Sequence, residues 1–285
     1  MSERAKPAKV LTPKERRAKA LCTALAVLIG LLFLFPLYWL AMYSFKSNNE
    51  VLIVSLWPLN PTLDAWKAQF ADSDFILWVR NSVVIALLAM GISVVLSVPA
   101  AYGLGRFNLP GKGGILLLFL VTQMMPASLL LTPMFLTFSR LKLLNTHLAP
   151  ALAVSTMSIP FIVVTLRPYF LAIPKSLDEA AIIDGCNPFT SFIRIMLPVI
   201  RTGLITCVVI TFLHGWNDLV FSMTFNVNKA MRPLTANINS FIDKYGTKWN
   251  AIMAYGMLLV LPVTLAFIFL QKHIVGGLTA GAVKG

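Results

Sequence analysis

Long runs without a charged residue alternate with short charged segments along the chain. Crossing a bilayer as a helix takes about 20 mostly apolar residues, because each residue advances the helix by about 1.5 Å and lipid cannot satisfy backbone polar groups. Five runs lack Asp, Glu, Lys and Arg, and a sixth contains only Asp218. The runs are bounded by Lys19 and Lys46, Arg80 and Arg106, Lys112 and Arg140, Lys142 and Arg167, Arg201 and Lys229, and Lys248 and Lys272. This pattern predicts an all-α integral membrane protein with six transmembrane helices.

The basic residues predict the orientation of these helices. With six spans, 15 of the 24 Lys and Arg residues fall on the side of the N-terminus, seven of them before the first run. Because positively charged segments stay in the cytoplasm, both termini are expected there. The external segments are then 46–80, 140–147 and about 224–250. The first run exceeds the apolar region of a signal peptide, which is about 7–15 residues long, and is interpreted as a retained span.

Composition excludes several other classes of protein. Only 12% of the residues are charged and 58% are hydrophobic, with a mean hydropathy of +0.79. These values exclude a disordered chain and disfavour a soluble domain. The formal charge of +13 is placed mostly between the apolar runs and not on one face, so it does not indicate nucleic acid binding. The three cysteines provide no disulfide framework.

The segment of residues 174–198, between the fourth and fifth spans, predicts two short helices joined by an elbow. Ser176 and Glu179 have the spacing of a capping box, and Asp178 adds negative charge to the first turn. Gly185 can adopt the left-handed conformation that ends a helix. Asn187-Pro188 can then cap and open a second helix that runs to Pro198. Local physics alone is equally compatible with a well-capped interfacial loop.

The spacing of this segment resembles a known signature. Glu179-Ala180-Ala181, Gly185, Ile195 and Leu197-Pro198 fit the EAA motif of the membrane subunits of bacterial ATP-binding-cassette importers. Further segments resemble the carbohydrate permeases of the maltose-transporter type. They are Ala100 to Phe107 with Pro110 to Lys112, Met125-Pro126, Thr132-Pro133, Trp216-Asn217-Asp218 and the end from Gly277 to Gly285.

The resemblance implies a function and a set of partners. The chain would be a permease subunit of the bacterial inner membrane, forming half of a sugar pathway with a second, homologous permease. Two cytoplasmic ATPase subunits would use ATP and Mg, an extracytoplasmic sugar-binding protein would deliver the substrate, and this chain would bind no cofactor and no nucleic acid. The domains expected are a basic tail over 1–19, a permease domain in the lipid bilayer over 20–274 and a cytoplasmic tail over 275–285.

The resemblance also implies that the segment from Glu179 to Gly185 is a coupling helix seated on an ATPase subunit. Glu179 would either cap its own helix or bond to the ATPase. The coupling residues expected are Glu179, Ala180, Ala181, Asp184, Gly185, Ile195, Leu197 and Pro198. The tail would reach between the ATPase subunits through Gly277, Thr279, Gly281 and Lys284, with simple fraying as the alternative.

The motifs that the chain lacks agree with a transport subunit and not an enzyme. Gly111-Lys112 has neither the upstream glycine nor the hydroxyl residue of a phosphate-binding loop, so another chain must hydrolyse ATP. The histidines are His147, His214 and His273, and no nucleophile or metal motif accompanies them.

Polar residues inside the predicted spans are candidates for the substrate path or gate, because ionisable groups at membrane depth usually face the bundle interior or water. His214 and Asp218 are four residues apart on one helix face. They could contact sugar hydroxyls, form the proton relay of an ion-coupled secondary transporter, or pack between helices. The path candidates are Gln123, Met124, Thr132, Thr156, His214, Trp216, Asn217 and Asp218. The external segment from Lys46 to Arg80 contains three tryptophans, which suit either docking of the binding protein or membrane anchoring.

Overall fold

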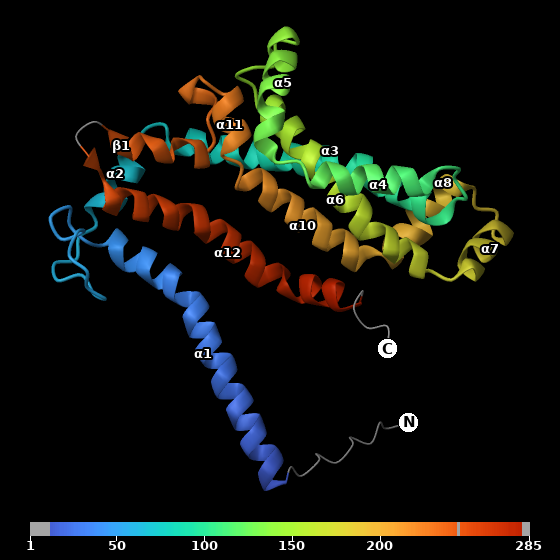
Figure 1. The fold of residues 1–285 in the computed structure, drawn as a ribbon, viewed down its shortest axis with the longest axis horizontal. Helices are drawn as coiled ribbons and strands as arrows, with labels where there is room; N and C mark the ends of the chain where they lie inside the picture. The colour runs from blue at the N-terminus through green and yellow to red at the C-terminus, as the bar shows by residue number, and fades with distance from the viewer. Residues whose placement is uncertain (1–11, 244–245, 281–285) are drawn as a thin grey trace. The chain divides into compact units, whose positions relative to one another are not determined.

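The computed structural model describes residues 12–243 and 246–280, and most of them are helical (Figure 1). The α-helices are α1 (Pro13–Ser44), α2 (Asp64–Ala71), α3 (Phe75–Arg106), α4 (Lys112–Gln123), α5 (Ala127–Arg140), α6 (Leu148–Ala172), α7 (Lys175–Ile183), α8 (Pro188–Ser191), α9 (Leu197–Val199), α10 (Arg201–Trp216), α11 (Val220–Phe225) and α12 (Trp249–Ala280). A π-helix, Phe192–Met196, joins α8 to α9, and two 3-10 helices, Lys229–Met231 and Thr235–Phe241, follow α11. Two compact units are formed, residues 1–68 with 248–257 and residues 69–247 with 258–285.

The first unit is built on α1, whose 32 residues would extend over about 48 Å. Thr12 and Glu15 form a capping box at its start. Most side chains between Leu21 and Tyr38 are exposed within this chain, as expected for a helix that faces lipid or another subunit. The loop after α1 is held by two buried charges. The Lys46 ammonium donates to the carbonyls of Ile53 and Ser55 at 2.8 and 3.2 Å, and Glu50 accepts from backbone N–H groups.

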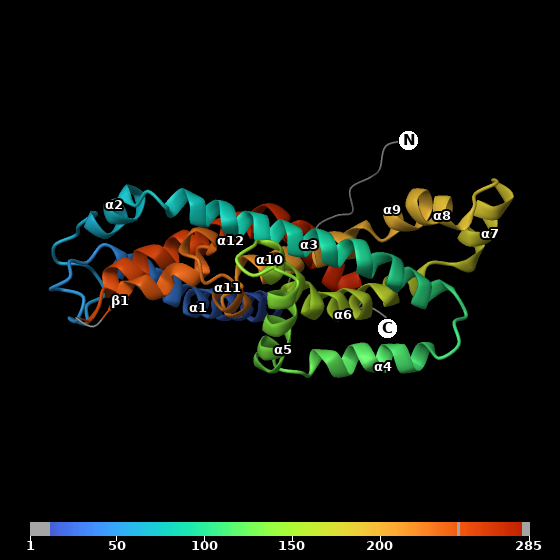
Figure 2. The ribbon, with the colours of Figure 1, turned by 90° about the horizontal axis from the view of Figure 1, so that it is seen from above.

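The second unit is a bundle of α3, α6 and α10, which pack side by side (Figures 1 and 2). Small residues allow close approach in this bundle, as is typical of membrane helices. A Cβ on Gly215 of α10 would lie 2.7 Å from the Cα of Ala86 on α3. Ser155 of α6 donates to the carbonyl of Ala89 at 3.2 Å. The bundle therefore needs its glycine and serine positions for packing.

The number of candidate spans differs from a simple count of apolar runs. By length and composition α1, α3 and α6 can each cross a bilayer. The third predicted span is a bent pair, in which α4 and α5 meet at 98°. Helix α10 covers the first part of the fifth predicted span and forms a second bent pair, at 83°, with the segment Pro188–Val199, which the sequence predicts as part of the elbow. With each pair counted as one span the described residues contain five, and the sixth, on α12, stays a prediction. Pro126 lies at the first bend and, having no N–H, cannot continue the helix.

One short β-hairpin departs from the all-α expectation. Ile242–Asp243 (β1) and Gly246–Thr247 (β2) pair antiparallel, with Ile242 opposite Thr247 and Asp243 opposite Gly246. The hairpin precedes α12 in the chain. Two-residue strands do not change the fold class, which is all-helical.

Candidate coupling site

The predicted elbow is present beyond the C-terminal ends of α3 and α6 (Figure 2). Helix α7 ends at Ile183, and Gly185 follows in the left-handed conformation with φ = 77°. The Cys186 N–H donates to the Ala181 carbonyl at 2.9 Å, which satisfies an orphan carbonyl of the last turn. The prediction that Gly185 closes this helix is confirmed.

The second helix of the elbow also begins where the sequence predicts. The Asn187 side chain accepts a hydrogen bond from the Thr190 N–H at 2.8 Å, and Pro188 occupies the first helical position. The helical path continues through the π-helix to Val199, one residue beyond the expected end. Local capping chemistry therefore sets both sides of the elbow.

The predicted capping box at Ser176 and Glu179 is wrong. Helix α7 begins at Lys175, and Pro174 occupies the N-cap position without a side-chain cap. A capping box needs the hydroxyl at the N-cap, whereas Ser176 lies two positions inside the helix. The capping interpretation of Glu179 is therefore excluded in this structure, and its side chain is exposed.

An apolar cluster fixes the elbow to the bundle. Phe192 and Met196 of the π-helix are buried in one cluster with Leu104 of α3 and Leu166 and Phe170 of α6. Leu177 of α7, with Ile195 and Leu197, packs against the same cluster. Ile195 and Leu197 of the EAA pattern thus lie against the bundle and do not form an outer surface.

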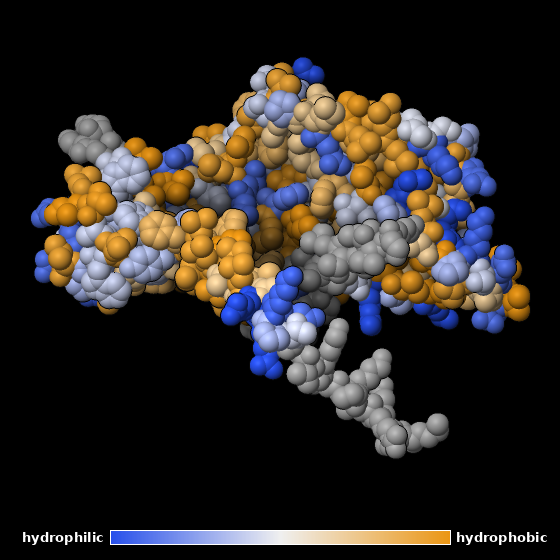
Figure 3. Space-filling view, turned by 60° about the horizontal axis from the view of Figure 1, so that its bottom comes forward, coloured by the Kyte–Doolittle hydropathy of each residue, from blue (hydrophilic) through white to orange (hydrophobic). Residues whose placement is uncertain are grey.

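The outer surface of the elbow includes only some of the expected coupling residues. Ala181 is only 1% exposed and packs inside the chain, whereas Ala180, Asp184, Gly185 and Pro198 are exposed. Two residues that sequence reasoning missed protrude beside them, Ile182 at 70% and Ile183 at 85% exposed. Figure 3 shows hydrophilic residues gathered over α7 and α8 at the right-hand end, while apolar residues cover much of the remaining visible face. The exposed side of α7 thus carries two large apolar side chains, Ile182 and Ile183.

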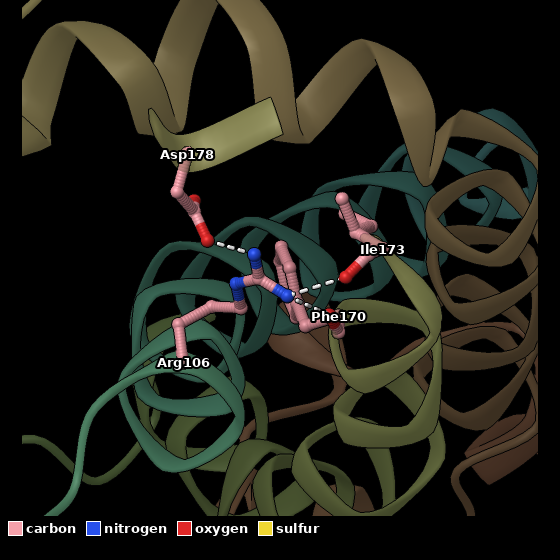
Figure 4. A network of polar contacts seen from close by, with 4 residues as sticks. All are labelled: Arg106, Phe170, Ile173 and Asp178. Atoms are coloured by element: carbon pink, nitrogen blue, oxygen red, sulfur yellow. Dashed lines mark hydrogen bonds and ion pairs between the residues drawn. The ribbon is translucent and has the colours of Figure 1, made fainter. Parts of the chain in front are cut away.

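An arginine connects three elements at this end (Figure 4). The guanidinium of Arg106, at the end of α3, donates to the carbonyls of Phe170 and Ile173 at 3.1 and 2.7 Å. It also forms an ion pair with Asp178 of α7. The side chain of Arg106 is 8% exposed and that of Asp178 is 32% exposed. Sequence reasoning did not identify this pair, since 72 residues separate the two partners.

The candidate path residues of the fifth span are placed in three different ways. Trp216 is 2% exposed and its indole N–H donates to the Leu259 carbonyl at 3.2 Å, as packing between helices requires. Asp218 accepts from the N–H and hydroxyl of Ser222, at 2.8 and 2.7 Å, and thereby caps α11. His214 and Asn217 are exposed, and His214 Nδ1 lies 3.2 Å from the Ser158 hydroxyl. The bonds of Asp218 and His214 run to different elements, so the proton relay has no support.

The path candidates of the third and fourth spans do not gather with His214. Thr156 lines a cavity of about 430 Å³ between α3, α5 and α6, where most neighbours are apolar. Gln123 ends α4, Met124 lies in the bend, and Thr132 is exposed on α5. In the tail, Gly277 and Thr279 belong to α12, whereas Gly281 and Lys284 lie outside the described residues.

At the opposite end of the bundle, α11 packs in a second apolar cluster through Phe221 and Phe225, and amide and hydroxyl groups hold the loop that follows. The Asn81 amide of α3 donates to the carbonyls of Ala230 and Arg232 at 2.8 and 3.0 Å, and its oxygen lies 2.8 Å from His147 Nε2. The Ser82 hydroxyl accepts from the Leu234 N–H at 2.8 Å. These bonds hold the loop of residues 226–235 against α3.

Comparison with known proteins assigns the family. Residues 93–279 match the family described as "Binding-protein-dependent transport system inner membrane component". The chain belongs to this family and is a transport subunit, a permease, with no enzymatic role of its own. The matched range includes the whole elbow and the Arg106 junction.

Relatives are similar over nearly the full chain. The diacetylchitobiose uptake system permease protein DasC of Streptomyces coelicolor is 31% identical, with 92% of this chain and 95% of that protein covered. The trehalose transport system permease protein SugB of Mycobacterium tuberculosis is also 31% identical, with 88% and 93% covered. A bacterial transporter for import of the acidic polysaccharide alginate contains a chain of similar fold, with a TM-score of 0.77, 20% identity, and 93% and 99% of the two chains covered.

Proposed function

We propose that this chain is the permease subunit of an ATP-binding-cassette importer for a sugar and that α7 is its coupling helix. In the proposed complex it pairs with a second, homologous permease, two ATPase subunits that use ATP and Mg, and an extracytoplasmic binding protein. Both termini and α7 lie on the cytoplasmic side. The observation that carries the proposal is the geometry of the elbow, an exposed apolar pair on a helix whose opposite side is fixed to the bundle.

The coupling surface consists of Glu179, Ala180, Ile182, Ile183 and Gly185. Exposed side chains of this size, held on a short helix, can fill a cleft of an ATPase subunit and exclude water there. On its inner side the helix packs against the underlying cluster through Leu177. A displacement of the seated helix is therefore passed to α3, α6 and α10.

A saccharide is the substrate class favoured by the relatives, whose names include diacetylchitobiose and trehalose. The path candidates retained are Gln123, Thr132, Thr156, His214 and Asn217, because their side chains are exposed and can donate or accept hydrogen bonds. Trp216 and Asp218 support the fold around them and are not part of the proposed sugar contact.

The loop after α1 is proposed to contact the external binding protein. Trp57 is 65% exposed, whereas the Trp66 indole N–H donates to the Ser44 hydroxyl at 3.1 Å and Trp78 is buried. Of the three tryptophans, only Trp57 is available to a partner. The buried Lys46 and Glu50 hold the backbone of this loop in one shape, which lowers the entropy lost on docking.

Co-purification of the ATPase tests the coupling role. Ile183→Asp places a charge at the centre of the proposed contact, and we expect it to reduce the ATPase recovered with the solubilised permease by at least about tenfold, because hot-spot losses exceed about 2 kcal/mol. The matched control is Leu52→Asp, which is 80% exposed in the loop after α1 and should leave ATPase recovery unchanged. Equal recovery with Ile183→Asp and wild type would refute the role of α7.

A further inference from the structure

We propose that Arg106 is a positioning residue that makes α3 move together with the coupling helix. The inference rests on the proposed function of α7 and adds a second route for its motion. The polypeptide already connects α7 to α6 and, through the elbow, to α10. Arg106 adds a direct connection to α3, the long helix that contacts both of them.

The geometry of the guanidinium suits this role. Its Nη1 donates to the carbonyls of Phe170 and Ile173, at the C-terminal end of α6, and its Nη2 pairs with Asp178 (Figure 4). Carbonyls at a helix C-terminus carry partial negative charge and attract a cation. A planar guanidinium can hold all three acceptors at once, whereas a lysine ammonium has no fixed fork of donors.

A second arginine makes the contact between α3 and α6 independent of Asp178. Arg167 of α6 donates from Nε to the Leu104 carbonyl of α3 at 3.2 Å. The helices also approach closely, since a Cβ on Gly105 would lie 3.0 Å from the Cβ of Phe170. Removing the charge of Asp178 therefore cuts the ion pair to α7 and leaves the α3 and α6 contact in place.

The ion pair is partly buried, which separates it from an ordinary surface pair. Exposed pairs contribute little because water screens them, whereas a charge-assisted bond to a buried guanidinium is held in one geometry. Among the residues that the structure describes, this is the one salt bridge. The ion pair lies at the junction of α7 with the two longest helices of the bundle. It can therefore pass the movement of α7 to α3.

Asp178→Asn in the reconstituted transporter, with all subunits present, is the first test. We expect ATPase co-purification and the unfolding temperature to remain near wild type. Sugar transported per ATP hydrolysed should fall by at least about fivefold, the lower end of ordinary coupling factors. Asp64→Asn, an exposed charge on α2, is the matched control and should keep the wild-type ratio. If Asp178→Asn transports as much sugar per ATP as the wild type, the inference is overturned. Loss of ATPase binding would also overturn it, because Asp178 would then belong to the contact between α7 and the ATPase.

A cross-link provides the converse test. In a background with the three native cysteines replaced by serine, Arg106→Cys with Asp178→Cys removes the ion pair, and a short thiol-cleavable cross-linker restores a covalent connection. If α3 and α7 move as one body, the cross-linked double variant transports sugar and loses transport when the linker is cleaved. Transport that is blocked by the cross-link would show that the two helices separate during the cycle, and the inference would fail. The co-purification of Ile183→Asp tests the coupling helix separately.

Discussion

The two ends of the α3, α6 and α10 bundle each contain an apolar cluster and differ in the polar groups that hold their connecting segments. At the α7 end, a large apolar cluster and one arginine fix the elbow. At the α11 end, Asn81, Ser82 and His147 hold the loop of residues 226–235 through hydrogen bonds to its backbone. We expect the first arrangement to move as a solid body, because the elbow is packed in the apolar cluster of the bundle. The second adds these hydrogen bonds to an apolar cluster that contains Phe138, Phe221 and Phe225, so we expect the loss of a single bond to leave the helices in place.

The largest effect is expected from a cavity at the α7 end. Phe170→Ala empties a fully buried site in the cluster, and cavity formation at such sites costs about 3–5 kcal/mol. The unfolding temperature should fall and ATPase recovery should be lost. Phe33→Ala, on the exposed surface of α1, is the control and should change neither. An unaltered unfolding temperature for Phe170→Ala would contradict the picture of a solid body.

An intermediate effect is expected from Asn81→Ala at the α11 end. The substitution leaves the carbonyls of Ala230 and Arg232 without their donor, and an unsatisfied buried group costs about 1–3 kcal/mol. Limited proteolysis should cut the loop of residues 226–235 faster, while ATPase recovery at the far end stays at the wild-type level. Asn48→Ala, at an exposed position, should leave the loop protected. Loss of ATPase recovery would show that the two ends are not independent.

The smallest effect concerns pH at the α11 end. Burial, and secondarily the charge of Arg80, lowers the pKa of His147, which precedes α6 and lies outside the membrane-spanning helices. The unfolded chain therefore takes up a proton at higher pH than the folded chain. The stability contributed by neutral His147 is complete above its ordinary pKa of about 6.5 and is lost as the pH falls below that value.

Unfolding temperatures of wild type and His147→Gln between pH 8 and pH 5 measure this effect. Glutamine can still donate to Asn81 but does not titrate. The wild-type protein should lose stability relative to the variant on the acid side, and parallel curves for the two proteins would contradict the assignment.

Local features of the elbow were predictable because they depend on neighbouring residues. Gly185 ends α7 because a residue without Cβ adopts positive φ at little cost, and Asn187-Pro188 starts the next helix through its own cap. The prediction of a capping box at Ser176 was wrong, because the spacing of Ser176 and Glu179 does not determine where the helix begins. The chain leaves α6 through Pro174, which takes the N-cap position two residues before Ser176.

The sequence by itself determined the membrane class, the charge-free spans, the elbow and the family resemblance, because these depend on composition and on spacing within a few turns. Tertiary structure decided which face of each element is covered. It buried Ala181 and exposed Ile183, placed Trp216 against Leu259, and turned Asp218 into a cap. It also joined Arg106 to Asp178. Contacts between distant segments depend on how helices are packed, and packing is set by the whole bundle, beyond the reach of a local pattern.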